Sequence, residues 1–337
     1  MHASRRYLVS IALLAGCGRS SGEGAAPAPA RPAAPAAHGR VETGRFASAS
    51  LGVDKAYRIY LPAGYDADPA RRWPVFYYLH GLGGTETDWI EHGKLDRAAD
   101  ELDLQAIVVM PDGDDGFYTD AAAPADLAGC RAARDPRHNC VRARAYRRYI
   151  VEDLVAHVDA TYRTVAAREG RAIAGLSMGG YGALVIGMTR PDRFAAAASH
   201  SGVDALLYRG PHPYVEGAPV HEVTDVRAFL AELGDFGALF GGVFGTDIAT
   251  WRASDPATLA ASLAPGALAL YLDAGDDDGL LLDDGARHLH AVLLRRGVQH
   301  EWFLGPGGHD WDFWAARVPH SLRFLAERVQ PRGLPSP

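Results

Sequence analysis

The chain has 337 residues, of which 48% are hydrophobic and 22% charged, the composition of a globular protein long enough for one large α/β domain. Its formal net charge of -7 argues against a general nucleic-acid binder. A basic stretch between residues 131 and 148 carries no aromatic platform or nucleic-acid motif, so we expect no nucleic-acid partner.

The N-terminal segment has the pattern of an export signal. Arg5 and Arg6 precede a short apolar core at residues 7–14, which is too short to span a membrane as a mature helix. The segment ends in LAGC, which resembles a bacterial lipobox, so we expect cleavage before Cys17 and lipidation of its thiol. The protein would then be exported and anchored in the bacterial cell envelope, with membrane contact only through this lipid. An ordinary signal peptide with an incidental cysteine is the alternative.

A linker follows this signal peptide, which we assign to residues 1–17. Residues 18–44 are rich in Ala, Pro, Gly and Ser and have no apolar period, so they predict a flexible or extended tether. The globular domain is expected over residues 45–330, with a short tail at residues 331–337.

Two further cysteines lie close together in a long insertion. Because an exported protein meets an oxidising compartment, we expect Cys130 and Cys140 to pair as a disulfide. A metal site with His138, which lies between them, is the alternative, but four well-placed ligands are not available. We therefore expect no metal.

Short apolar runs predict strands, and the stretches between them predict helices. The strands are expected at residues 56–61, 75–79, 105–110, 172–174, 195–201, 267–272 and 299–304. The helices are expected at residues 85–102, 149–162, 180–188 and 311–329. This alternation predicts an α/β fold with a mostly parallel central sheet and helices on both faces. The less regular, aromatic-rich residues 203–262 are interpreted as a small cap insert over the site.

The sequence RAIAGLSMGGYGAL at residues 171–184 is typical of a nucleophile elbow. A buried strand leads into Ser177 and a small-residue helix follows it, so the serine lies at the apex of a sharp turn. Gly175 and Gly179 lack the Cβ atoms that would collide where the strand and the helix pass each other. A glycine-rich turn with a bystander serine is the alternative.

A second glycine-rich loop, HGLGG at residues 80–84, follows the strand expected at residues 75–79. Enzymes with such an elbow take one oxyanion-hole N–H from the residue after the nucleophile and another from a loop of this kind. The backbone amides of Met178 and Leu82 are therefore the predicted oxyanion hole.

A serine nucleophile needs a histidine base and a carboxylate that orients it, in the chain order serine, acid, histidine. The strand expected at residues 267–272 leads into a turn with three adjacent carboxylates. We assign Asp278 as the acid, with Asp277 as the alternative. His309 lies in a glycine-rich loop after the last expected strand and is the predicted base.

Other polar residues follow expected strands without a clear catalytic assignment. Asp112, Asp114 and Asp115 lack the spacing of an EF-hand and are interpreted as a solvated loop. His80 and His200 end two strands and could line the site.

Five motifs together carry a resemblance to a known family: YLHGLGGTETDW, GLSMGGYGAL, FGTDIATWRASDP, LDAGDDDGL and GGHDWDFW. The chain resembles the esterase D and antigen 85 family of α/β-hydrolases, which includes feruloyl and acetyl-xylan esterases and S-formylglutathione hydrolases. The resemblance covers residues 45–330. It implies an α/β-hydrolase fold, a triad of Ser177, Asp278 and His309, and an oxyanion hole at the amides of Leu82 and Met178. The cysteine-bearing insertion and the lipid anchor depart from the cytosolic S-formylglutathione hydrolases.

These observations predict a serine carboxylic ester hydrolase that works through an acyl-enzyme without metal or cofactor. Its substrate would be a small-molecule or carbohydrate-linked ester. An acyltransferase that passes the acyl group to a sugar hydroxyl is one alternative, because it would use the same residues. A non-catalytic binding lipoprotein on a hydrolase scaffold is another. The sequence leaves the acyl group, the alcohol and the oligomeric state open.

Overall fold

The computed structural model describes residues 38–123, 141 and 143–329. Cys17, Cys130, His138 and Cys140 lie outside these residues, so the lipid anchor and the disulfide stay predictions. Within the described part of the chain, no helix is both long and apolar enough to cross a membrane.

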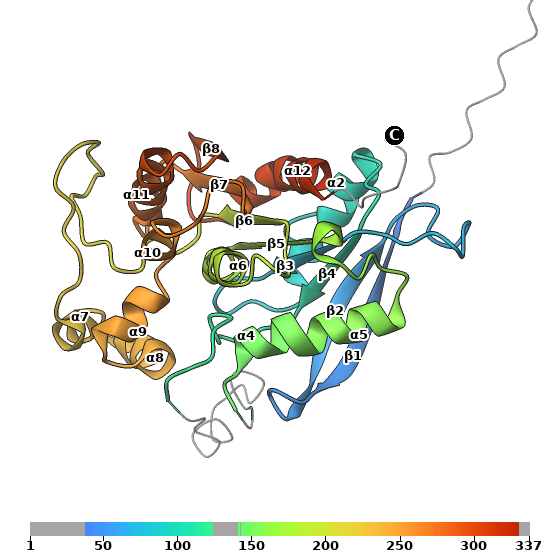
Figure 1. Cartoon of the computed structure of the whole chain (residues 1–337), viewed down its shortest axis with the longest axis horizontal. Coiled ribbons are helices and arrows are strands. Elements are labelled where there is room, and N and C mark those ends of the chain that lie inside the picture. Colours follow the sequence, from blue (N-terminus) through green and yellow to red (C-terminus); the bar gives the residue numbers. More distant parts are fainter. Residues whose placement is uncertain (1–37, 124–140, 142, 330–337) are drawn as a thin grey trace, which may run out of the picture. The chain divides into compact units, whose positions relative to one another are not determined.

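The described residues contain an eight-stranded sheet in the order β1-β2-β4-β3-β5-β6-β7-β8 (Figure 1). The strands are β1 (Arg40–Ser48), β2 (Val53–Leu61), β3 (Val75–Leu79), β4 (Ile107–Pro111), β5 (Arg171–Leu176), β6 (Ala196–His200), β7 (Ala269–Gly275) and β8 (His300–Gly305). β1 and β4 both pair antiparallel with β2, whereas every neighbouring pair from β4 to β8 is parallel. The predicted α/β class with a mostly parallel sheet is confirmed.

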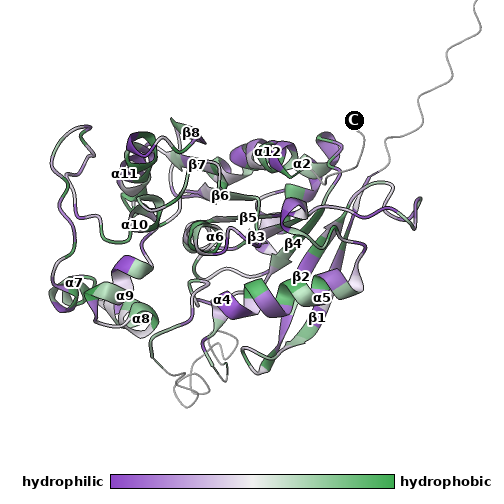
Figure 2. Cartoon of the chain, in the orientation of Figure 1, coloured by the Kyte–Doolittle hydropathy of each residue, from purple (hydrophilic) through white to green (hydrophobic). Residues whose placement is uncertain are grey.

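Helices cover both faces of the sheet. One face packs against α6 (Met178–Thr189), α11 (Leu282–Arg295), α5 (Val155–Thr161) and the π-helical turn Tyr149–Leu154. The other face packs against α12 (Trp311–Arg328), α1 (Asp88–Glu91) and α2 (Leu95–Glu101). Hydrophobic and hydrophilic residues are interspersed along α5 and α12 (Figure 2), as expected for helices with one buried face.

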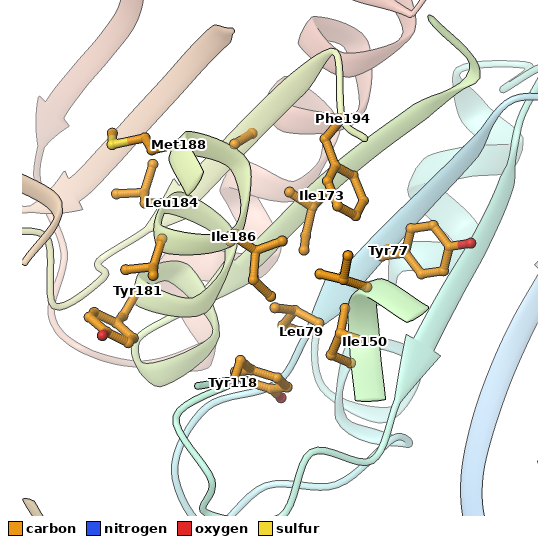
Figure 3. Packing of buried hydrophobic residues seen from close by; sticks show 14 of the residues in the cluster. Tyr77, Leu79, Tyr118, Ile150, Ile173, Tyr181, Leu184, Ile186, Met188 and Phe194 are labelled. Carbon is orange, nitrogen blue, oxygen red and sulfur yellow. The ribbon is translucent and has the colours of Figure 1, made fainter. Parts of the chain in front are cut away.

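The strands feed two hydrophobic clusters because successive residues of a strand point to opposite faces. Tyr77 and Leu79 of β3 join the cluster under α6 (Figure 3), whereas Phe76 and Tyr78 join the cluster under α12. β3, β4, β5 and β6 are buried at every position, which is typical of central parallel strands. The loops after these strands therefore leave a rigid, fully packed base.

Between β6 and β7 the chain forms a helical insert. Its helices are α7 (Val226–Glu232), α8 (Asp235–Phe244), α9 (Ile248–Ala253) and α10 (Pro256–Ala260). The first three lie together beside the sheet (Figure 1). Phe240 and Phe244 meet Phe117 edge-on, so α8 contacts the segment that follows β4. The insert lies within residues 203–262, where the sequence predicts one; that it caps the site stays a prediction.

Three segments differ from the expected elements. Residues 40–44, which the sequence assigns to the linker, form the first half of β1 and pair with β2. The helix expected over residues 85–102 is divided into α1 and α2 by Lys94, whose φ of 52° is left-handed and cannot continue a helix. The helix expected over residues 149–162 follows the short α4 (Tyr146–Arg148) and begins with a π-helical turn.

Candidate active site

Ser177 lies at the sharp turn between β5 and α6. Its φ of 51° and ψ of -118° are strained for a residue with a side chain, and its N–H donates to the carbonyl of His200 at 2.9 Å. A Cβ added at Gly175 would overlap the backbone of Gly179, and a Cβ at Gly179 would overlap the end of β3. The two glycines therefore permit the close crossing that exposes the serine, as the elbow motif requires.

His309 lies between the serine and an aspartate. Its Nε2 is 2.9 Å from Ser177 Oγ, and its Nδ1 is 2.9 Å from an oxygen of Asp278. Since a carboxylate only accepts hydrogen bonds, Nδ1 carries the proton and Nε2 is free to accept the hydroxyl hydrogen of Ser177. The structure thus brings together the three side chains that the sequence singles out, and Asp278 rather than Asp277 faces the imidazole.

The acid turn and the histidine loop support each other. The Asp278 side chain is fully buried, and its second oxygen accepts the N–H of Leu280 at 2.8 Å. Asp277 is exposed, and its N–H donates to Gly307 in the histidine loop at 3.0 Å. The turn therefore holds the carboxylate in one orientation and also fixes the loop that carries the imidazole.

The predicted oxyanion-hole amides belong to two different elements. Met178 opens α6, and the first N–H groups of a helix have no partner within it. Leu82 lies in the loop after β3 and is 38% exposed. The N–H of the next residue, Gly83, donates to Asp115 Oδ1 at 2.7 Å, which ties this loop to the turn after β4.

The His80 ring makes a second tie between the same two loops. Its Nδ1 donates to the carbonyl of Gly81 at 2.7 Å, and its Nε2 accepts the N–H of Gly113 at 2.8 Å. These partners fix the neutral Nδ1-protonated form, because a carbonyl cannot donate and an amide N–H cannot accept. Tyr118 also donates to the carbonyl of His80 at 3.1 Å. His80 thus holds the loop from within, at 1% exposure.

Of the aspartates after β4, Asp114 is buried and Asp112 and Asp115 are half-buried, which corrects the expectation of a solvated loop. Lys55 of β2 lies 2.7 Å from Asp112 and 2.9 Å from Asp114, and Tyr146 donates to Asp114 at 2.5 Å. Burial raises the pKa of Asp114. For Asp112, burial is outweighed by the Lys55 ammonium and the backbone N–H of Asp114, which hold its pKa well below the usual value. The turn is therefore a structural ion cluster behind the Leu82 loop.

Two further residues of the site have no clear signal in the sequence. Trp314 lies edge-on to the His309 ring, with 4.9 Å between ring centroids, and Asp115 supports the Leu82 loop. Only the position of Trp314 within GGHDWDFW, five residues after the histidine, hints at its contact. His200 is fully buried and does not line the site. Among the described residues, no group of three His, Cys, Asp or Glu side chains is arranged to hold a metal ion.

Comparison with known proteins assigns the family. The family model described as "Putative esterase" matches residues 48–325. Esterase Rv1288 of Mycobacterium tuberculosis is 31% identical over 314 residues, covering 85% of this chain and 61% of the relative. The chain therefore spans less than two thirds of that relative's length. An acetyl esterase of Caldicellulosiruptor saccharolyticus is 24% identical over 259 residues, covering 75% of this chain and 83% of the relative.

Solved structures show the same fold. An S-formylglutathione hydrolase from Agrobacterium tumefaciens superimposes with a TM-score of 0.64 at 22% identity, covering 87% of this chain and 96% of that one. MPT51 of Mycobacterium tuberculosis gives a TM-score of 0.62 at 17% identity, covering 86% and 99%. The fold and the family expected from the five motifs are confirmed: the chain has the α/β-hydrolase fold and belongs to the esterase family.

Proposed function

We propose that the protein is a serine carboxylic ester hydrolase with Ser177 as nucleophile, His309 as base and Asp278 as orienting acid. The observation that carries the proposal is the continuous hydrogen-bonded chain of these side chains, with both distances at 2.9 Å. Ser177 lies on a strained elbow at the carboxyl end of β5. This is the position at which this fold presents a nucleophile.

The reaction would run in two halves. Ser177 Oγ attacks the ester carbonyl while His309 Nε2 takes its proton, and Asp278 stabilises the imidazolium that forms. The N–H groups of Leu82 and Met178 stabilise the oxyanion of the tetrahedral intermediate. Its collapse breaks the bond to the alcohol, which leaves with the proton from His309. Water then attacks the acyl-enzyme with His309 again as base, which releases the acid and restores the serine.

The substrate class that we propose is a small-molecule or carbohydrate-linked ester, supported by esterase relatives such as the acetyl esterase. No metal or cofactor takes part in the proposed steps, because the imidazole and the backbone amides supply proton transfer and charge stabilisation. A sugar hydroxyl could replace water in the second half, which would make the enzyme an acyltransferase. Product analysis with and without added sugar acceptors separates these two outcomes.

The direct test compares the full chain with its Ser177→Ala variant. We expect one covalent adduct of a fluorophosphonate probe on the wild type by intact mass, none on the variant, and loss of p-nitrophenyl acetate and butyrate hydrolysis with it. A folded wild type that takes up no probe and turns over neither ester would contradict the enzyme assignment. It would leave a binding role on a hydrolase scaffold.

We also propose export and lipid anchoring at Cys17, together with a Cys130–Cys140 disulfide, on the sequence pattern alone. Mass spectrometry of the protein from a bacterial host should show a diacylglyceryl-modified N-terminal cysteine. Peptide mapping without reduction should show the cross-linked cysteine peptides. An unmodified residue 17, or two free thiols in the exported protein, would contradict the respective proposal.

A further inference from the structure

A second Ser–His–Asp arrangement lies in the interior of the molecule. Ser321 Oγ of α12 is 2.8 Å from His200 Nε2, and His200 Nδ1 lies 2.9 and 3.0 Å from the two oxygens of Asp273. These distances match those of the candidate active site, yet all three residues are fully buried. No substrate can reach Ser321, which lies within α12, two residues after Pro319, and not at an elbow. The arrangement therefore needs a role other than nucleophilic catalysis.

The negative charge of Asp273 is compensated by Arg317 of α12. Arg317 donates from Nε to Asp273 at 3.1 Å, and Tyr271 donates its hydroxyl to the same carboxylate at 2.7 Å. Such compensation is required, because an unpaired charge buried in this position would strongly destabilise the fold. We call Ser321, His200, Asp273 and Arg317 the buried network.

The buried network fixes how α12 sits on the sheet. Residues 314, 317 and 321 lie on one face of the helix, since they are spaced by three and four positions. Each of the three bonds to β6, β7 or the residue after β6. Ser321 bonds to His200 and Arg317 bonds to Asp273. Trp314 Nε1 donates to Ser201 Oγ, directly after β6, at 3.2 Å. Two tyrosine hydroxyls also bond to this helix face, Tyr78 to Ser321 and Tyr271 to Arg317. The apolar contacts of the face have no directional preference. A shifted helix would leave buried polar groups unpaired, so the network selects one register.

The same helix carries the base of the candidate active site. His309 directly precedes Asp310, which caps α12 by accepting the N–H of Phe313 at 2.9 Å. Trp314 meets the His309 ring edge-on. The nucleophile also contacts the buried network, because the N–H of Ser177 donates to the carbonyl of His200. The buried network thus contacts the backbone of the nucleophile and the helix that holds the base.

We propose that the buried network positions His309 against Ser177 by fixing the register of α12. Its members are positioning residues, because they act through the helix and do not touch the substrate. The inference rests on the proposed function, in which His309 is the base. It predicts that a change more than two helical turns away from His309 alters the chemical step.

The principal variant is Ser321→Ala, measured in the full chain with p-nitrophenyl acetate. We expect kcat to fall about tenfold with little change in KM, since a small displacement of a catalytic group slows chemistry more than binding. Tyr78→Phe removes a hydroxyl that lies 2.9 Å from Ser321 Oγ and should have a smaller effect of the same kind. Thr164→Val is the matched control. It removes an equally buried hydroxyl that donates to Asp159 at 2.6 Å, remote from α12, and should leave kcat unchanged.

A spectroscopic readout tests the inference without turnover. His309 and His200 should each give a far-downfield imidazole N–H signal by proton NMR, because both Nδ1 protons face carboxylates. Loss of one signal in His309→Gln and of another in His200→Gln assigns them. In Ser321→Ala the His309 signal should shift or broaden. If the wild type hydrolyses no ester, the proposed function fails. The His309 signal in Ser321→Ala still shows whether the buried network positions the His309 ring.

Two results would overturn the inference. One is a folded Ser321→Ala protein whose kcat and His309 signal both equal those of the wild type. The other is fluorophosphonate labelling of Ser321 in the Ser177→Ala variant, because a reactive second serine would mean that the buried arrangement is a nucleophilic site and not a support for α12.

Discussion

At the scale of single residues, the neighbours Asp277 and Asp278 offer the sharpest comparison. Asp278 is buried and bonded to His309, whereas Asp277 is exposed and uses its backbone to hold the histidine loop. Replacing the orienting acid by its amide favours the wrong imidazole tautomer, so we expect Asp278→Asn to lower kcat by about 10³- to 10⁴-fold. Asp277→Asn should stay within about threefold of the wild type, since its side chain does not face the imidazole.

Steady-state hydrolysis of p-nitrophenyl acetate measures both variants, with circular dichroism to show that each is folded. Equal losses in the two variants would contradict the assignment of Asp278 as the only orienting acid. The sequence left this choice open because three adjacent carboxylates follow β7. Only the three-dimensional turn decides which of them points inward.

Asp204 is a buried carboxyl that the proposed mechanism does not use. It lies after β6 and accepts the Ser199 hydroxyl at 2.7 Å, while its other oxygen has no partner among the described residues. Burial raises the pKa of Asp204 from its ordinary 3.8 to about 7, with a further increase from the charge of Asp273. Between these two values the unfolded chain releases the proton and the folded chain keeps it. Stability should therefore fall as the pH rises from about 4 to about 7 and then level off.

The Asp204→Asn variant should remove this dependence. Its gain in melting temperature over the wild type should be small at pH 5 and larger at pH 8, where ionisation costs the wild type on the order of 4 kcal/mol. Thermal unfolding at several pH values measures the effect, and Asp276→Asn, an exposed carboxylate, controls for the loss of one negative charge. A gain that is the same at both pH values would show that Asp204 does not titrate in this range.

At the scale of elements, the sequence predicted what local patterns determine. The apolar run at Val75–Leu79 is a strand with the expected bounds. The elbow around Ser177 follows from the glycine spacing together with the apolar strand before it and the small-residue helix after it. Partners distant in the sequence could not be predicted in this way. The aspartates after β4 look like a solvated turn until Lys55, 57 residues before Asp112, is placed beside them by the pairing of β2 with β4.

The difference between local patterns and distant contacts also explains two wrong predictions, the undivided helix over residues 85–102 and the place of His200 in the site. Lys94 has ordinary helix propensity, so nothing in its identity predicts the left-handed φ that separates α1 from α2. His200 ends a strand near the elbow, which suggests a place in the site. Its side chain instead points to the face covered by α12, where Asp273 and Ser321 bind it. Strand alternation specifies the face only after the register is known.

At the scale of the whole molecule, the sheet order accounts for the position of the site. β5 lies between β3 and β6 in the middle of the parallel sheet, so the loops after β3, β7 and β8 can meet around Ser177. Residues 80–84, 276–279 and 306–310 are far apart in the sequence, yet parallel strands end at one edge. The chain order serine, acid, histidine was therefore predictable, because it follows from this topology.

The edge at β1 was missed from the sequence, and it sets a limit on truncation. Residues 40–44 contain none of the Ala and Pro residues that mark the linker before them, and they form the first half of a nine-residue pairing with β2. Just before β1, the N–H of Gly39 donates at 2.8 Å to Asp100, which also accepts the hydroxyl of Tyr60 at 2.8 Å. A chain that begins at residue 45 loses these bonds and leaves half of β2 as an open edge.

We therefore expect a chain beginning at residue 38 to unfold at the same temperature as the full chain, and a chain beginning at residue 45 to unfold several degrees lower. A loss of 1 kcal/mol lowers the melting temperature of a large domain by about 2 to 4 °C. Differential scanning calorimetry of the three proteins measures the shift, and aggregation of the shortest chain would agree with an exposed strand edge. Identical melting temperatures for all three would mean that residues 40–44 add no stability, as the linker assignment implies.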